Sequence, residues 1–372
     1  MPAGLGGTAD PVIVGAGLAG LALAAALGRP SLVLERAPAL REAGAGLQVT
    51  PNGMRVLQAL GLRDAVEAAS VAAEAVEPMD ALTGRRIARF GLAGAGPYRF
   101  LHRAALLDIL AGAARAAGAE VRLGTEALGV TERGVATAAG EVAAPLLLGA
   151  DGLRSAVRAA LDPSRAAFTG QVAWRAVVGA DHPPVARVWM APGRHAVTYP
   201  LPGGLVNLVA VREEARWSEE GWRHPDSPAN LRRAFADAAP PLAAILAAVA
   251  RTHRWGLFRH PVARRWQDGR RAILGDAAHP TLPFLAQGAN LALEDAWTLA
   301  RLLREGRLHD LERLRRPRVL RAVAAAQANA RRYHLGGAAR RGAHFALAAV
   351  GRLAPGAFLG RLDWLYGFDA TR

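Results

Sequence analysis

The sequence predicts an α/β fold in which a Rossmann-type dinucleotide-binding domain carries an inserted, mainly antiparallel β domain and ends in a helical region. Three observations predict this fold: a glycine-rich strand–turn–helix at the N-terminus, an apolar strand that ends in Gly-Asp, and a β-rich middle. At 372 residues the chain is long enough for two domains. We expect a discontinuous nucleotide-binding domain at 1–70, 97–170 and 260–316, a β domain at 71–96 and 171–259, and a helical region at 317–372.

The first element is a βαβ unit. An apolar strand over 11–14 leads into Gly15-Ala16-Gly17-Leu18-Ala19-Gly20 and then into an Ala/Leu run that is typical of a helix. This is the G-x-G-x-x-G pattern, in which Gly15 makes the tight turn, Gly17 admits a pyrophosphate and Gly20 permits close packing. Glu35 closes the second strand about 20 positions after the first glycine, where an acid binds ribose hydroxyls.

The following elements alternate in type. Residues 51–61 have helical periodicity, 71–96 indicate paired strands around a Thr-Gly turn, and 104–117 are strongly helical. The apolar run 146–148 predicts a strand that leads into an Asp-Gly turn. Four strand-like runs between 172 and 211 are separated by turns that contain Pro-Gly, as in antiparallel hairpins.

A second ligand-binding pattern lies between positions 274 and 303. The apolar strand ends in Gly275-Asp276, a Pro-rich loop follows, and Gly288-Ala289-Asn290 opens a helix-like segment. A carboxylate accepts hydrogen bonds from hydroxyl groups, and free N–H groups at a helix start stabilise an anion. The pattern therefore predicts a ligand with hydroxyls and a developing negative charge.

Composition excludes several classes of protein. Without cysteine the chain has neither disulfides nor thiolate ligands, and we expect no metal. The net charge of +15 comes from arginines that are scattered rather than gathered in a tail, so we expect anionic small molecules rather than nucleic acid. The first ten residues lack the regions of a secretory signal, and no apolar run is long enough to span a bilayer. We expect a cytoplasmic monomer or homodimer.

Three ordered motifs carry a family resemblance. Gly15–Gly20 with Glu35, the run 149–158, and Leu274–Asp295 resemble the FAD motifs of single-component aromatic-ring flavoprotein monooxygenases, which have the para-hydroxybenzoate-hydroxylase-like fold. Finer matches resemble the salicylate-hydroxylase-like branch. They are the run 41–48 with Pro51-Asn52, Ala173-Trp174-Arg175, Thr198-Tyr199-Pro200, Tyr333-His334-Leu335 and Asp363-Trp364-Leu365-Tyr366-Gly367.

The resemblance implies a bound FAD. Glu35 would bind the adenosine ribose, Asp276 the ribityl or pyrophosphate region, and the N–H groups of 288–290 would face the pyrimidine edge of the flavin. The residues implied in FAD binding are Gly15, Gly17, Leu18, Ala19, Gly20, Glu35, Arg36, Arg41, Gln48, Arg103, Asp151, Gly152, Asp276, Pro280, Gly288, Ala289 and Asn290.

The resemblance also implies hydroxylation of a phenolic, salicylate-like small molecule with O2 through a flavin C4a-hydroperoxide. Only one dinucleotide fingerprint is present, so NAD(P)H would bind transiently in a groove. A dry pocket protects the oxygenating species. Its predicted apolar walls are Trp174, Trp189, Pro283, Phe284 and Leu285, and the predicted catalytic residues are His195, Tyr199 and Gln48.

Other functions stay open at this point. An FAD-dependent epoxidase, a natural-product hydroxylase or a dehydrogenase would share the same fold, and a non-catalytic nucleotide-binding protein could share it as well. The sequence leaves open the substrate, the regiochemistry, the choice of NADH or NADPH, any decarboxylation, and the catalytic base.

Overall fold

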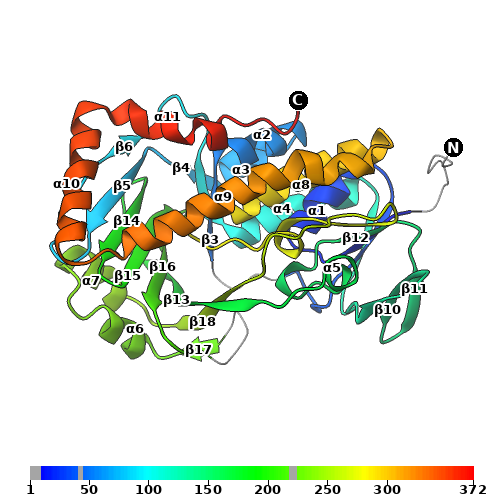
Figure 1. Ribbon diagram of the computed structural model, residues 1–372, viewed down its shortest axis with the longest axis horizontal. Coiled ribbons are helices and arrows are strands. Elements are labelled where there is room, and N and C mark those ends of the chain that lie inside the picture. The colour runs from blue at the N-terminus through cyan, green and yellow to red at the C-terminus, as the bar shows by residue number, and fades with distance from the viewer. Residues whose placement is uncertain (1–9, 41–44, 218–223) are drawn as a thin grey trace.

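A computed structural model describes residues 10–40, 45–217 and 224–372 (Figure 1). Its α-helices are α1 (Leu18–Leu27), α2 (Pro51–Ala59), α3 (Arg63–Ala68), α4 (Arg103–Ala116), α5 (Ala156–Leu161), α6 (Pro228–Ala234), α7 (Pro240–Ala247), α8 (Gly288–Arg304), α9 (Leu311–Tyr333), α10 (Gly337–Leu353) and α11 (Pro355–Tyr366). Short 3-10 turns are η1 (Gly152–Arg154), η2 (Gly275–Ala277) and η3 (Leu308–Asp310).

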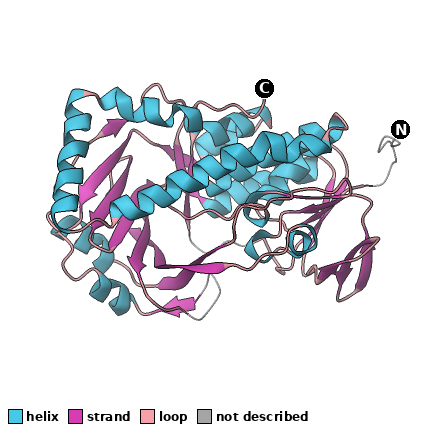
Figure 2. Cartoon of the chain, viewed as in Figure 1, coloured by secondary structure: helices cyan, strands magenta, loops and turns pink. Residues whose placement is uncertain are grey.

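The strands form two large and two small sheets (Figure 2). They are β1 (Val12–Val14), β2 (Ser31–Leu34), β3 (Gly46–Val49), β4 (Ser70–Ala72), β5 (Ala75–Asp80), β6 (Phe90–Gly91), β7 (Arg99–His102), β8 (Ala119–Arg122), β9 (Gly129–Val130), β10 (Gly134–Thr137), β11 (Gly140–Ala143), β12 (Leu147–Gly149), β13 (Ala167–Gly179), β14 (Val185–Ala191), β15 (Arg194–Leu201), β16 (Leu205–Glu213), β17 (His224–Asp226), β18 (Thr252–Arg259) and β19 (Arg271–Ile273).

The parallel sheet has the strand order β19-β12-β1-β2-β8. Its central strands are fully apolar, as expected for a sheet with both faces covered. Helix α1 packs between this sheet and its neighbours α4 and α8, and its residues are almost all buried. The carboxyl ends of β1, β2, β12 and β19 meet at one edge, where an open α/β sheet binds ligands.

The larger sheet has the order β17-β18-β13-β16-β15-β14-β5-β6 and is antiparallel except for the β14–β5 pair. Because side chains alternate along a strand, its two faces have different partners. Trp174, Ala196 and Leu208 lie on the face that packs against α6 and α7. Ala173 and Val211 lie on the opposite face, in a cluster with residues of α9.

Helix α9 crosses the molecule from the parallel sheet to the larger sheet (Figure 1). After it, α10 and α11 meet at a bend of 98°. Within the described ranges no single helix is long and apolar enough to cross a membrane, and only that bent pair meets the criterion when its two helices are combined. The α/β class, the mainly antiparallel second sheet and the helical C-terminus predicted from the sequence are confirmed.

Buried charges join α9 to α8. Arg315 is 1% exposed and forms ion pairs with Glu294 (2.8 Å) and Asp295 (2.7 Å), and Arg318 bonds both oxygens of Glu294 at 2.7 Å. Burial alone would raise the pKa of Asp295, but His279 and Arg315 outweigh it and lower this pKa to about 2. Asp295 is therefore ionised in the interior, and both acids depend on their arginine partners.

The same network extends to the loop before α8. Asp295 accepts hydrogen bonds from the backbone N–H of Gly275 (3.0 Å) and from His279 Nε2. Glu294 accepts from Asn52 of α2 at 2.7 Å, so the network joins three segments that are distant in sequence. The buried charges thus fix the position of the 275–279 turn.

We predict that Arg315→Met lowers the free energy of unfolding by about 3–5 kcal/mol, because it leaves two buried carboxylates undercompensated. Chemical denaturation of the purified protein measures this change. The matched control is Arg313→Met on the same helix, whose exposed pair with Asp310 predicts a change within about 0.5 kcal/mol. Equal stability of the two variants would contradict the role of the network.

Candidate active site

The glycine loop between β1 and α1 opens onto a cleft at the edge of the parallel sheet. Gly15 has φ +100°, and a Cβ there would lie 2.5 Å from the carbonyl oxygen of Ala150. A Cβ at Gly20 would lie 1.9 Å from the carbonyl oxygen of Gly15. At Gly17, by contrast, a Cβ would meet no described atom within 4 Å. Two glycines therefore pack the loop, and the third leaves room for a ligand.

The start of α1 is an anion site. Its first intrahelical bond runs from the N–H of Leu21 to the carbonyl of Gly17, and no side chain caps the helix. The N–H groups of residues 18–20 thus have no intrahelical acceptor. Together with the helix dipole they suit a phosphate or pyrophosphate group.

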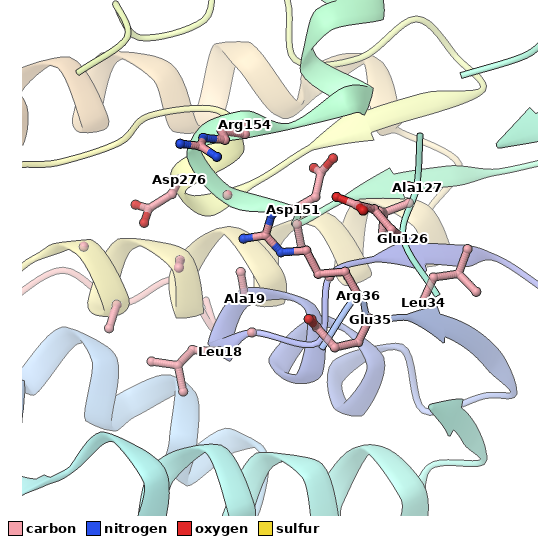
Figure 3. A pocket seen from close by; sticks show the side chains of 18 of the residues that line it. Leu18, Ala19, Leu34, Glu35, Arg36, Glu126, Ala127, Asp151, Arg154 and Asp276 are labelled. Carbon is pink, nitrogen blue, oxygen red and sulfur yellow. The ribbon is translucent and has the colours of Figure 1, made fainter. Parts of the chain in front are cut away.

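Glu35 lies beside this loop at the end of β2. Its two oxygens accept backbone hydrogen bonds from Ala16 (2.8 Å) and Ala37 (2.9 Å), which hold the carboxylate against the glycine turn. Figure 3 shows Glu35 with Glu126 at one end of the cleft and Asp276 with Arg154 at the other. Glu35 is therefore positioned to accept hydrogen bonds from the hydroxyl groups of a ligand at its end of the cleft.

The cleft has a volume of about 250 Å³ and is elongated between these two ends. Its lining comes from the carboxyl ends of the parallel strands and from the starts of α1, α4 and α8. The residues that line it are Val14, Gly15, Gly17, Leu18, Ala19, Leu34, Glu35, Arg36, Arg103, Thr125, Glu126, Ala127, Ala150, Asp151, Gly152, Arg154, Asp276, Gly288, Ala289 and Ala292.

Asp151 presents an unused acceptor to the cleft. Its Oδ2 accepts from the N–H of Ala156 at 2.7 Å, whereas its Oδ1 is buried and has no hydrogen-bond partner among the described residues. Burial raises the pKa of this carboxyl. A buried polar atom without a partner is costly, so Oδ1 fits a donor supplied by a ligand.

Asp276 faces the other end of the cleft. The surrounding protein desolvates its carboxyl and raises the pKa, while the charges of His279 and Arg103 act in the opposite direction. The side chain is nevertheless exposed to the open space of the cleft. A hydroxyl or phosphate group that enters here meets both the acid and the guanidinium of Arg103.

Helix α8 begins at the same end. Ala286, just before it, has φ +53°, and no other non-glycine residue in the described ranges has a positive φ. The side chain of Asn290 holds this turn by donating to the carbonyl oxygens of Ala286 (2.6 Å) and Gln48 (3.1 Å). The N–H groups of 288–290 precede the first intrahelical bond, so they stay available to an anion.

Most residues predicted for FAD binding meet in this cleft. Gly20 packs behind its loop, and neither Pro280, Gln48 nor Asn290 is among the lining residues. Arg41 lies outside the described residues. Sequence reasoning missed Arg154 and the Thr125–Ala127 segment. The latter follows β8, and the rule that ligands bind at the carboxyl edge of parallel strands would have found it.

A tyrosine cluster joins β15, the start of β7 and the end of α11. Tyr98 donates to Gln48 Oε1 at 2.6 Å and packs edge-on against Tyr366 at 6.0 Å. Phe100 stacks on Tyr199 at 5.1 Å. Burial raises the pKa of Tyr98, Tyr199 and Tyr366, so these phenols keep their protons and can donate hydrogen bonds.

Arg175, His195 and Tyr199 share one face of the larger sheet. The register aligns Ala173 of β13 with Val211 of β16 and His195 of β15. Side chains two or four positions apart on a strand point to the same face, so Arg175 and Tyr199 lie on the face of His195. Strand spacings place the Cα atoms of Arg175 about 12 Å from those of His195 and Tyr199. The Arg175 guanidinium lies 5.0 Å from the centre of the Trp255 ring. The three polar groups thus surround a patch of this face.

His195 is 1% exposed and sits among rings. The ring centre of His195 lies 5.1 Å from that of Phe284, which is oriented edge-on. It lies 5.2 Å from the ring centre of Tyr333 and 5.0 Å from that of His334. Burial and the neighbouring His334 lower the pKa of His195 well below its usual value, so its imidazole is neutral at pH 7. Burial raises the pKa of Tyr333 to about 12.

The structure corrects part of the predicted pocket wall. Trp174 and Trp189 lie in the cluster under α6 and α7, on the sheet face opposite Arg175, because their strand positions have the other parity. Pro283 is exposed. Phe284 and Leu285 do lie on the Arg175 face, in the cluster with Trp255.

Comparisons with known proteins agree with this geometry. A family model described as an FAD binding domain matches residues 8–326. The chain is 36% identical to a 3-amino-4-hydroxybenzoate 2-monooxygenase of Streptomyces platensis, over 96% of both chains. It is 32% identical to a 3-hydroxybenzoate 6-hydroxylase of Polaromonas naphthalenivorans, again over 96% of both.

Solved structures share the fold. A salicylate hydroxylase substrate complex has a TM-score of 0.81 at 23% identity, covering 97% of this chain and 96% of that one. Klebsiella pneumoniae HpxO complexed with FAD and uric acid has a TM-score of 0.82 at 24% identity, covering 95% and 97%.

We predict that Gly17→Val folds normally but binds FAD about 10–100-fold more weakly. The new side chain meets open space in the protein, whereas it overpacks the cleft once a pyrophosphate enters, at a cost of about 1–3 kcal/mol. Titration of the apoprotein with FAD measures the affinity. Gly179→Val at the end of β13, another open glycine that is not among the lining residues, serves as the control. Unchanged FAD affinity in Gly17→Val would place the pyrophosphate elsewhere.

Proposed function

Because the chain belongs to the FAD-dependent aromatic monooxygenases, we propose that it hydroxylates the ring of a hydroxybenzoate with NAD(P)H and O2. The observation that carries the proposal is the shared sheet face of Arg175, His195 and Tyr199, which offers a cation for a carboxylate and a neutral base for a phenol. The relatives named for aminohydroxybenzoate and 3-hydroxybenzoate support this substrate class.

The cleft fits FAD. Gly17 leaves space for the pyrophosphate, Glu35 can receive the ribose hydroxyls, and the unpartnered Oδ1 of Asp151 awaits a donor. When bound, FAD supplies the electron transfer and oxygen insertion that side chains cannot perform. The N–H groups at the start of α8 can stabilise negative charge at the flavin end of the cleft.

Arg175 binds the substrate carboxylate in this proposal. A guanidinium suits a carboxylate because its fork can donate two parallel hydrogen bonds. The ring of Trp255 supports it on one side and restricts its orientation. The carboxylate therefore sets which ring carbon faces the flavin.

His195 takes the phenol proton. A phenolate ring is more electron-rich than a phenol, so deprotonation favours attack by an electrophilic oxygen. His195 is neutral and its Nδ1 is engaged by His334, which leaves Nε2 as the acceptor. Tyr199, which keeps its own proton, can donate a hydrogen bond to the bound substrate. Phe284 and Leu285 exclude water from this region.

The direct test is an assay of the purified holoprotein with NADH or NADPH. We expect 3-hydroxybenzoate, 3-amino-4-hydroxybenzoate or salicylate to accelerate oxygen uptake and to yield a ring-hydroxylated product, identified by mass spectrometry. Oxygen uptake that none of these acids stimulates, while phenols without a carboxylate are hydroxylated, would refute the proposed substrate class.

We predict that Arg175→Met raises KM for the hydroxybenzoate substrate about 10–100-fold, because a desolvated charge pair contributes about 1.5–3 kcal/mol. Activity with the corresponding phenol, which lacks the carboxylate, should change little. Arg212→Met, on the opposite face of the same sheet, is the control and should leave both values unchanged. An equal loss with acid and phenol would assign Arg175 a purely structural role.

A further inference from the structure

We propose that His334 and Glu213 continue from His195 as a proton relay that connects the substrate pocket to the protein surface. The proposal rests on the proposed function, since it assumes that His195 receives the phenol proton. Neither His334 nor Glu213 touches the substrate, and both act through His195.

The three groups form a continuous hydrogen-bonded chain. Nδ1 of His195 lies 2.7 Å from Nε2 of His334, and Nδ1 of His334 lies 2.9 Å from Oε1 of Glu213. The chain runs from the interior to solvent: the His334 side chain is 2% exposed and that of Glu213 is 58% exposed. A proton can therefore cross the protein wall in short steps without any side chain moving away.

The acceptor at the end of the chain fixes the direction of every bond. A carboxylate oxygen accepts hydrogen bonds, so Nδ1 of His334 donates to Oε1 of Glu213. In neutral His334 the other nitrogen, Nε2, is then the acceptor, so Nδ1 of His195 donates. This leaves the lone pair of His195 on Nε2, the nitrogen that has no hydrogen bond to the described residues. The carboxylate at the surface thus prepares the base in the pocket.

Backbone contacts hold the relay in place. The turn at Gly193 has φ +66°, its N–H donates to the carbonyl of His334 (3.1 Å), and its carbonyl accepts from the N–H of Glu213 (2.9 Å). One turn thereby positions both outer members. The titratable groups that face the histidines are Tyr333 and Glu213, and the aromatic ring of Phe284 closes the remaining side.

Both histidines are poised to pass a proton rather than keep it. Burial lowers the pKa of His195, and the neighbouring His334 lowers it further. Burial also lowers the pKa of His334, although Glu213 opposes this effect. Neutral imidazoles relay protons readily, because each nitrogen can gain a proton as the other loses one.

The step is balanced and transfers no electrons. The substrate O–H bond breaks and an N–H bond forms at Nε2 of His195, while the proton on its Nδ1 moves to Nε2 of His334. The proton on Nδ1 of His334 moves to Glu213, which releases it to water. After hydroxylation the same path can return a proton to the product and restore both starting tautomers.

The test follows proton transfer itself. A hydroxybenzoate is bound to the oxidised holoprotein, the pH is raised in a stopped-flow mixer, and the ultraviolet absorbance of the phenolate is recorded. We expect His334→Gln to slow phenolate formation about 100-fold, because glutamine can keep both hydrogen bonds but cannot pass a proton. Substrate affinity should stay within about twofold, a split that a structural role would not give.

Glu213→Gln is the second variant, and its exposed position avoids a folding defect. We expect a slowing of about tenfold, since the obligatory acceptor at the surface is lost. Glu214→Gln is the control: this neighbouring carboxylate pairs with Arg212 and Arg254 instead of a histidine, and its loss should leave the rate unchanged.

Two results would overturn the relay. Phenolate formation at the wild-type rate in both His334→Gln and Glu213→Gln would do so and leave the proposed hydroxylase function standing. Wild-type protein that binds no hydroxybenzoate would overturn the proposed function together with the relay.

Discussion

Two arginines of α9 meet two acids of α8 in the interior, and the position of the Asp276 end of the cleft depends on this contact. Asp295 accepts the N–H of Gly275 and so fixes the residue that precedes Asp276 in the cleft. Glu294 reaches Asn52, which also bonds Gln287 at the start of α8. Buried ion pairs of this kind are weak evidence for stability, but breaking one is costly. In this protein the ion pairs fix the position of the turn at Gly275 and of the start of α8.

The second constraint is strand parity. In the larger sheet every other residue faces Phe100 of β7 and Phe284 of the loop before α8. That parity selects Arg175, His195 and Tyr199 and turns Trp174 away toward α6 and α7. A largely apolar face that carries the guanidinium of Arg175 suits a small aromatic acid, because the ring is desolvated and only the carboxylate and phenol need polar partners. The chemistry of the pocket thus follows from the alternation of side chains.

Local sequence brings together most of the residues that line the cleft. Gly15, Gly17 and Glu35 act through backbone geometry and short-range bonds, so their spacing alone carries the information. The proposed substrate contacts are harder to predict from sequence. Trp174 in β13 and Trp189 in β14 look equally suited to a pocket until the register of the strands is known. The contact of His334 with His195 joins residues 139 positions apart and leaves no local signal. Tertiary pairing, rather than propensity, decides such contacts.

The proposed function requires one sheet face to orient a hydroxybenzoate against the flavin end of the cleft. A crystal structure of the holoprotein with 3-hydroxybenzoate tests it most directly. We expect the carboxylate on the guanidinium of Arg175 and the phenol oxygen within hydrogen-bond distance of His195 Nε2. A substrate bound with its carboxylate away from Arg175, or with its phenol oxygen out of reach of His195, would contradict it.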